Sequence, residues 1–98
     1  FLLVDSGGQY ESGTTDITRT YALGPLTDEK REAYTLVLKC HIAAARAVFK
    51  AGSAGMHIDI LARETLWRRG LDYRCGTGHG VGFVGVIHEG PQGLLNRA

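Results

Sequence analysis

The chain has 98 residues, 44% of them apolar and 21% charged, which is ordinary for one small soluble globular domain. Its net charge of +1 gives no electrostatic support to nucleic-acid binding, and no apolar stretch approaches the roughly 20 residues that cross a bilayer. The two cysteines form no CxxC pair and are too few for a disulfide framework, so a reducing, cytoplasmic setting fits best. Neither nucleic acid nor a membrane is an expected partner.

The first predicted element is a β-hairpin that carries two acidic residues. An apolar run over residues 1–4 ends at Asp5, and a second strand-like run over residues 17–23 follows Asp16. The stretch between them is rich in Gly, Ser and Thr, as tight turns are. Folding back would bring the two carboxylates close together, and such a pair repels unless a cation or a shared proton lies between them. The alternative is that each aspartate accepts hydrogen bonds from turn amides.

Two amphipathic helices are predicted next. Thr27 is placed to cap the first, with acidic residues in its first turn, and apolar residues recur at helical spacing for about five to six turns before Gly52. The second begins near Met56 and ends at Gly70, which suits a left-handed C-terminal cap. The single histidine in each helix is expected to take no part in chemistry. The charged residues of the second helix are predicted to face solvent: Asp59, Arg63, Glu64, Arg68 and Arg69.

The last third of the chain alternates glycine with other residues around one histidine. Glycine occupies every second position from Gly76 to Gly82, and His79 lies at the centre between two of these glycines. Residues 83–87 are predicted to form a strand, and residues 88–91, His-Glu-Gly-Pro, to close it with a turn. The order of strands, two helices and strands predicts an α+β fold.

Three familiar motifs fit this last third poorly. The glycines of residues 80–85 match a dinucleotide-binding pattern, but a β-branched stretch follows them instead of a helix. A zinc-protease helix is excluded because residues 90–91, Gly-Pro, cannot continue it. Cys75 and His79 have a spacing that some zinc sites use, but no second pair completes the ligand set, and nothing marks the cysteine as an activated nucleophile.

The residues left for chemistry are Asp5, Asp16, His79 and His88. Carboxylates and imidazoles suit a hard to borderline divalent metal such as manganese, iron, cobalt or zinc. The glycines beside His79 would let the backbone approach a metal or a substrate closely. The alternative is structural: His79 would be a hydrogen-bonded turn histidine, and His88 would cap the turn that follows it.

The aspartate motifs carry a resemblance to a known family. Residues 5–10, Asp-Ser-Gly-Gly-Gln-Tyr, and 13–20, Gly-Thr-Thr-Asp-Ile-Thr-Arg-Thr, resemble the two-aspartate signature of the pita-bread metallopeptidases. Residues 76–82, closing on 88–91, resemble the aminopeptidase P (Xaa-Pro aminopeptidase) branch in particular. The predicted helices lie between these motifs with the family's spacing, so the resemblance covers essentially the whole chain. It implies an α+β pita-bread fold, in which two helices pack on the outer face of a curved antiparallel sheet.

The resemblance also implies that residues 1–98 are the N-terminal to middle part of a catalytic domain. We expect a piece of a larger domain, because the chain starts at Phe1 within a strand-like run and stops at Ala98 after a loop-like Gly-Pro-Gln-Gly. Later strands of the family domain carry two glutamate ligands, and Glu89 matches neither of them. These residues alone are therefore expected to be inactive.

In the family, two divalent metal ions, often manganese, with zinc or cobalt as alternatives, activate the water that attacks the peptide bond before proline. By resemblance, Asp5 would chelate one metal, Asp16 would bridge both, and His79 would bind the other. His88 matches the family histidine that contacts the substrate and stabilises or shuttles charge at the scissile bond. The implied activity removes the N-terminal residue from peptide substrates that have proline at the second position.

Two other functions stay open. A prolidase, which cleaves Xaa-Pro dipeptides, shares both aspartates and the histidine. The alternative from another class is a pita-bread binding protein that has lost its metals, but such relatives usually lose ligand residues that are intact here. A homodimer is also compatible with the sequence.

Overall fold

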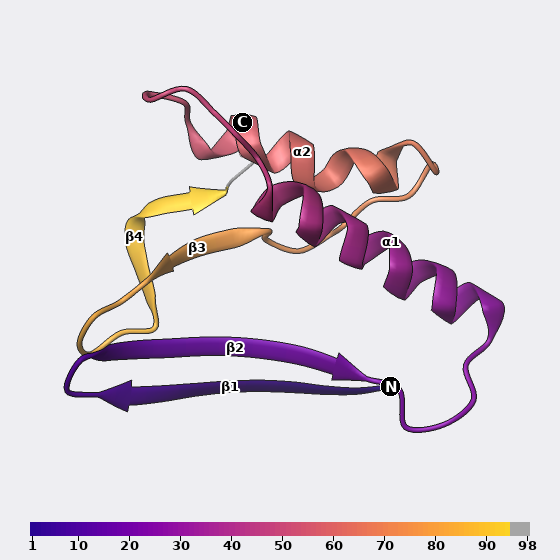
Figure 1. The fold of residues 1–98 in the computed structure, drawn as a ribbon, viewed down its shortest axis with the longest axis horizontal. Helices are drawn as coiled ribbons and strands as arrows, with labels where there is room; N and C mark the ends of the chain where they lie inside the picture. Colours follow the sequence, from indigo (N-terminus) through magenta and orange to yellow (C-terminus); the bar gives the residue numbers. More distant parts are fainter. Residues whose placement is uncertain (95–98) are drawn as a thin grey trace. The chain divides into compact units, whose positions relative to one another are not determined.

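The computed structural model describes residues 1–94. In chain order the elements are β1 (Leu2–Tyr10), β2 (Gly13–Tyr21), α1 (Asp28–Ala45), α2 (Gly55–Trp67), β3 (Gly78–Val81) and β4 (His88–Leu94) (Figure 1). The predicted order of strands, helices and strands is confirmed. The chain divides into two compact units: the strand unit, residues 1–26 and 79–92, and the helical unit, residues 27–78 with the end of β4. Neither helix of the described chain is long and apolar enough to cross a membrane.

β1 and β2 form the hairpin expected from the aspartate motifs, in a continuous antiparallel register that ends where Tyr10 pairs with Gly13. Only the two residues between them make the turn, so the strands are longer than predicted, and two glycines predicted in the turn lie inside β1. A Cβ at Gly7 would lie 3.0 Å from the Thr15 carbonyl oxygen and 2.9 Å from the Ile87 side chain. Glycine at this position therefore permits close packing rather than a turn.

β3 and β4 form a second two-stranded sheet, which differs from the prediction. The residues expected to form a strand, 83–87, lie in the connection, and the expected turn at 88–91 is the first part of β4. A Cβ at Gly80 would overlap the carbonyl oxygen of Glu89, so this glycine lets the two strands approach closely. The prediction of a strand over residues 83–87 was wrong because it used local apolar composition. The close approach of Gly80 to Glu89 joins two segments and cannot be inferred from that composition.

α1 begins where the sequence predicts, since the Lys30 amide donates to Oγ1 of Thr27 at 3.3 Å. Its 18 residues make about five turns. The helix ends at Ala45, earlier than the predicted stop before Gly52. Beyond that point Val48 is 96% exposed. Most helical stability comes from packing of an apolar face, so the helix ends where that packing ends.

Both ends of α2 have local hydrogen bonds that close the helix. The Ala54 amide donates to Nδ1 of His57 at 3.0 Å, which satisfies an amide at the N-terminus and gives this histidine a local partner. Past the other end, Gly70 has a φ of 67° and its amide donates to the Trp67 carbonyl at 3.0 Å. The predicted left-handed glycine is therefore confirmed.

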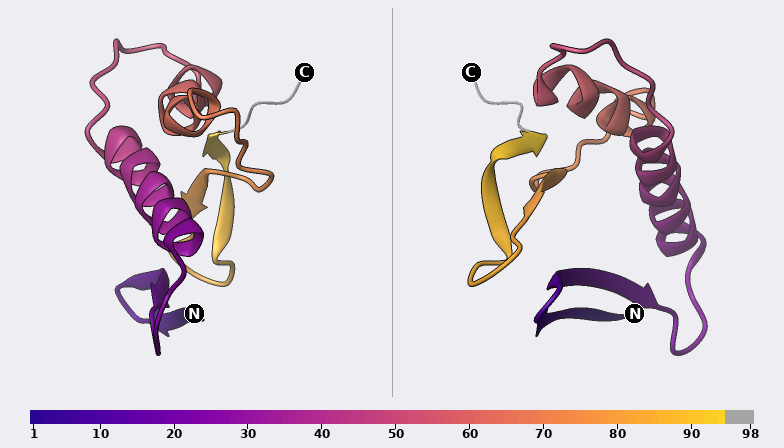
Figure 2. Two further views of the ribbon diagram at one scale, coloured as in Figure 1. Left: turned by 90° about the vertical axis from the view of Figure 1, so that its right-hand side faces the viewer. Right: turned by 60° about the vertical axis from the view of Figure 1, so that its left-hand side comes forward.

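The core of the helical unit lies between α1 and α2, which pack against each other (Figure 2). It consists of Leu36, Cys40 and Leu66, with Tyr73 packed against them. The prediction that Asp59 and Arg63 face solvent is wrong, because the Asp59 side chain is fully buried and that of Arg63 is only 12% exposed. A buried carboxylate needs compensating partners, and those partners come partly from residues beyond α2 that helical spacing does not reveal.

Candidate metal centre

The strand unit brings together three side chains that could coordinate a metal ion. Asp16 lies on β2, His79 on β3 and His88 at the start of β4. Oδ2 of Asp16 lies 3.4 Å from Nε2 of His79 and 3.4 Å from Nε2 of His88, and ligand atoms of all three residues lie within 4.8 Å of one another. The two imidazole rings have centroids 4.0 Å apart and are tilted by 51°. This spacing suits one cation shared by the three side chains.

The three side chains differ in access to solvent. The Asp16 side chain is 16% exposed, that of His79 43% and that of His88 72%, so the carboxylate is the most enclosed of the three. Nδ1 of His79 lies 2.9 Å from the Gly80 carbonyl oxygen. With the proton on Nδ1 this contact is a hydrogen bond, and Nε2 directs a lone pair toward Asp16, the arrangement typical of metal-binding histidines. A lone pair facing a carboxylate is unfavourable without a proton or a cation between them.

Asp5 lies on the same face of the hairpin as Asp16 but outside the tight group of three. In the hairpin register Asp5 pairs with Thr18, and Asp16 lies two residues before Thr18 on β2. The two aspartates are therefore diagonal neighbours across the strands, with Cα atoms on the order of 7–8 Å apart. Both line an open depression of about 590 Å³ together with His88. Oδ1 of Asp5 accepts a hydrogen bond from the Thr18 hydroxyl at 2.8 Å, instead of the turn amides considered from the sequence.

The four candidate residues thus occupy the strand unit, and their donors fit a divalent metal. Carboxylate oxygens and imidazole nitrogens are the donors that manganese, iron, cobalt and zinc share in proteins. The geometry does not separate the two histidines, because each lies equally close to Asp16. The assignment of His79 as a ligand and His88 as a substrate contact stays a prediction.

Sequence reasoning missed two threonines that support this centre. Thr18 holds Asp5, and the Thr14 hydroxyl contacts Oε1 of Gln9 at 2.8 Å and the Phe83 carbonyl oxygen at 3.1 Å. The second contact joins the hairpin to the connection between β3 and β4. Side chains two apart on a strand share a face, so Thr14 and Thr18 lie on the face that carries Asp16. The spacing of two residues from Asp16 was therefore the signal in the sequence that could have identified these threonines.

Comparison with known proteins identifies the class of protein. The whole chain, residues 1–98, matches Metallopeptidase family M24, and the chain belongs to this family. The crystal structure of an X-prolyl aminopeptidase from Caenorhabditis elegans has a similar fold, with a TM-score of 0.91 at 48% sequence identity over 98% of this chain and 16% of that chain. It is described as a cytosolic enzyme with a di-nuclear active site. The predicted pita-bread fold of α+β class is confirmed by this match.

Two curated relatives of known name are more similar in sequence than the C. elegans enzyme. The Probable Xaa-Pro aminopeptidase P of Fusarium vanettenii is 59% identical over 95 residues, which cover 97% of this chain and 15% of that protein. The protein of the same name from Tuber melanosporum is 58% identical over 95 residues, with the same 97% and 15% coverage. The chain therefore spans about 15% of the length of the curated relatives it matches.

Proposed function

We propose that the protein carrying this chain is a metal-dependent aminopeptidase that removes an N-terminal residue preceding proline. The observation that carries the proposal is the convergence of Asp16, His79 and His88 within 4.8 Å. The similarity to Xaa-Pro aminopeptidases supports the choice of substrate. Because the chain spans about 15% of those relatives, residues 1–98 supply part of the catalytic domain, and the remaining ligands come from elsewhere in the protein.

The proposed ligands of this chain are Asp5, Asp16 and His79. Together with ligands from the rest of the protein they would hold two divalent ions, for which manganese is the first proposal and zinc or cobalt the alternatives. The di-nuclear site of the C. elegans enzyme supports two ions rather than one. Asp16, the most enclosed of the cluster, is the proposed bridge between them. When bound, such ions lower the pKa of water to the range of a neutral-pH nucleophile and polarise the scissile carbonyl. Thr18 fixes the direction in which Asp5 presents its free oxygen.

His88 is the proposed contact to the substrate. Its side chain is 72% exposed, so a peptide in the depression can reach it, whereas Asp16 lies deeper. An imidazole can donate a hydrogen bond or transfer a proton, so His88 can act at the scissile bond while a neighbouring carboxylate orients its ring.

The other functions considered from the sequence rank lower. A metal-free binding protein does not require two carboxylates and an imidazole on one depression with a second imidazole beside them. The relatives named above are Xaa-Pro aminopeptidases rather than prolidases. We place the protein in the cytosol, because the C. elegans enzyme is described as cytosolic. Its proposed partners are peptides with proline at the second position. A homodimer stays a prediction from the sequence.

The test uses the protein that carries this chain, stripped of metal and then supplied separately with manganese, zinc and cobalt. We expect an Xaa-Pro-Xaa peptide to lose its first residue, an Xaa-Ala-Xaa control to be cleaved poorly, and manganese to restore the highest rate. Preference for an Xaa-Pro dipeptide would favour a prolidase. Absence of cleavage with all three metals would overturn the proposal.

A further inference from the structure

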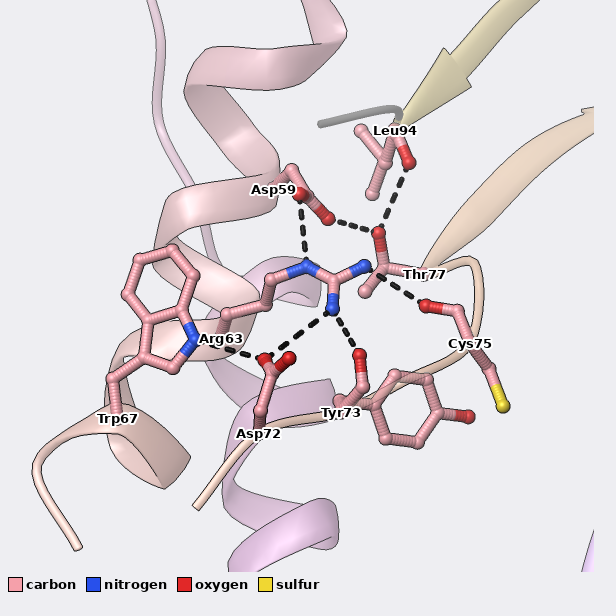
Figure 3. A network of polar contacts seen from close by, with 8 residues as sticks. All are labelled: Asp59, Arg63, Trp67, Asp72, Tyr73, Cys75, Thr77 and Leu94. Atoms are coloured by element: carbon pink, nitrogen blue, oxygen red, sulfur yellow. Dashed lines mark hydrogen bonds and ion pairs between the residues drawn. The ribbon is translucent and has the colours of Figure 1, made fainter. Parts of the chain in front are cut away.

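A buried charged pair in the helical unit has no part in the proposed chemistry. Asp59, on α2, is 0% exposed, and its Oδ2 accepts a hydrogen bond from Nε of Arg63 at 2.9 Å (Figure 3). Arg63 lies one helical turn further on, and its side chain is only 12% exposed. Burying two charges is unfavourable unless both are paired and fully hydrogen-bonded, so such a pair requires further partners.

The partners of Arg63 lie in the segment that leads into β3. The guanidinium donates through Nη1 to the Tyr73 carbonyl and through Nη2 to the Cys75 carbonyl at 2.8 Å (Figure 3). Residues 71–77 are neither helix nor strand, so these carbonyls have no sheet partner, and the guanidinium supplies the donors. A planar fork with several N–H groups can reach a carboxylate and two carbonyls at once, which an ammonium cannot do in the same geometry.

Thr77 completes the network from the other side of Asp59. Its hydroxyl contacts Oδ1 of Asp59 and lies 3.1 Å from the carbonyl oxygen of Leu94, the last residue of β4. We call Asp59, Arg63 and Thr77 the α2 clamp. The clamp holds the chain at three alternate positions, 73, 75 and 77, immediately before β3 begins at Gly78.

We propose that the α2 clamp is a positioning device for His79. The inference rests on the proposed function, in which His79 is a metal ligand. Only Gly78 separates the last clamped residue from this histidine, so a shift of the clamped segment displaces the start of β3. A ligand has to be held within about 0.5 Å of its productive place, so it needs restraint on its strand beyond the pairing of β3 with β4. The clamp supplies it without touching the metal.

Four substitutions separate this role from general stability. Thr77→Val removes the hydroxyl at nearly constant shape, and Thr77→Ser restores it. Arg63→Lys keeps a positive charge beside Asp59 but loses the planar fork. Arg68→Lys is the matched control, because Arg68 also pairs with an acid one turn away on α2, Glu64 at 2.5 Å, but its side chain is 75% exposed.

The readouts are manganese affinity, by calorimetric titration of the whole protein that carries this chain, and thermal unfolding of the same protein without metal. Thr77→Val and Arg63→Lys are expected to weaken manganese binding about tenfold or more, as loss of a supporting contact does at other metal sites. Thr77→Ser and Arg68→Lys are expected to bind like the wild type. Leu36→Val serves as a stability control, because it removes a methylene from the core and no polar atom from the clamp.

The outcomes distinguish the inference from the proposed function. The inference is overturned, and the proposed function stands, if Thr77→Val binds manganese as tightly as the wild type or loses no more affinity than Leu36→Val. A wild-type protein that binds none of manganese, zinc and cobalt would overturn the proposed function, and the inference with it. If Arg63→Lys does not fold, Thr77→Val decides, because it leaves the Asp59–Arg63 pair in place.

Discussion

Asp5 and Thr18 face each other across the hairpin, and the threonine hydroxyl donates to Oδ1 of the carboxylate at 2.8 Å. One oxygen of Asp5 is thereby held in a fixed direction, which leaves the other with a defined place on the face shared with Asp16. Contacts of this kind to metal-binding side chains commonly tune metal affinity. At the scale of single residues, the proposed centre therefore depends on a threonine that binds no metal itself.

Thr18→Val is expected to weaken manganese binding by about 10–100-fold, because Asp5 loses the donor that orients it. Thr18→Ser keeps a hydroxyl and should bind nearly as the wild type does. Calorimetric titration of the metal-free protein measures both. Equal affinity for the valine variant and the wild type would show that the hydrogen bond to Asp5 is incidental.

The two histidines should separate by function although they lie equally close to Asp16. His79→Ala is expected to lose metal, because a proposed ligand is gone. His88→Ala is expected to keep its metal and lose rate by about 10²–10⁴-fold, as positioned acid–base groups do. Elemental analysis beside a Xaa-Pro cleavage assay measures both effects. If His88→Ala is as metal-poor as His79→Ala, the proposed division of roles is wrong.

At the scale of elements, the sequence predicted correctly those features that depend on neighbouring residues. It failed where a feature depends on contacts between distant segments. The caps of the helices are set by Thr27 and Gly70, which act on their own neighbours, and both were predicted. The β3–β4 pairing depends on Gly80 meeting the Glu89 backbone, and apolar composition suggested a different strand. The prediction that Asp59 faces solvent came from the apolar stripe of an amphipathic helix, opposite which charged residues usually lie. The burial of Asp59 is decided by Thr77, which lies 18 positions further along the chain.

Gly80→Ala tests the close approach of β3 and β4. A Cβ there would overlap the Glu89 carbonyl oxygen, so the substitution is expected to lower the free energy of unfolding by roughly 1–3 kcal/mol. Gly76→Ala is the control, because a Cβ at Gly76 would have no atom within 4 Å. Urea unfolding of both variants gives the comparison. Equal stabilities would mean that the strands can separate at no cost.

A pH-dependent contact lies at the C-terminal end of α2. The Trp67 indole donates to Oδ1 of Asp72 at 2.9 Å, and this bond is the main cause that holds the pKa of Asp72 below its usual value. Because the pKa is lower in the folded chain than in the unfolded one, the ionised form stabilises the fold. That contribution is complete above the unfolded pKa of about 3.9 and is lost as the pH falls through the lower, folded value.

Asp72→Asn should therefore be slightly less stable than the wild type near neutral pH, and the difference should shrink as the pH falls below about 3.9. Urea unfolding at a series of pH values measures it. A difference that stays constant over the whole series would contradict the assigned role of the carboxylate.

At the scale of the whole molecule, residue types and spacing were enough to select Asp5, Asp16, His79 and His88. The supporting residues were not selected, because Thr18 and Arg63 act through pairings across strands and between a helix and a distant segment. That the 98 residues alone are inactive stays a prediction. Its physical basis is that these ligands would leave two metal ions incompletely coordinated.

The most direct test of the proposed centre is anomalous X-ray scattering from crystals of the protein that carries this chain, grown with manganese. The account predicts an anomalous peak at the manganese edge about 2.0–2.3 Å from a carboxylate oxygen of Asp16 and from Nε2 of His79. Manganese bound elsewhere in the protein, with no peak at Asp16 and His79, would contradict it.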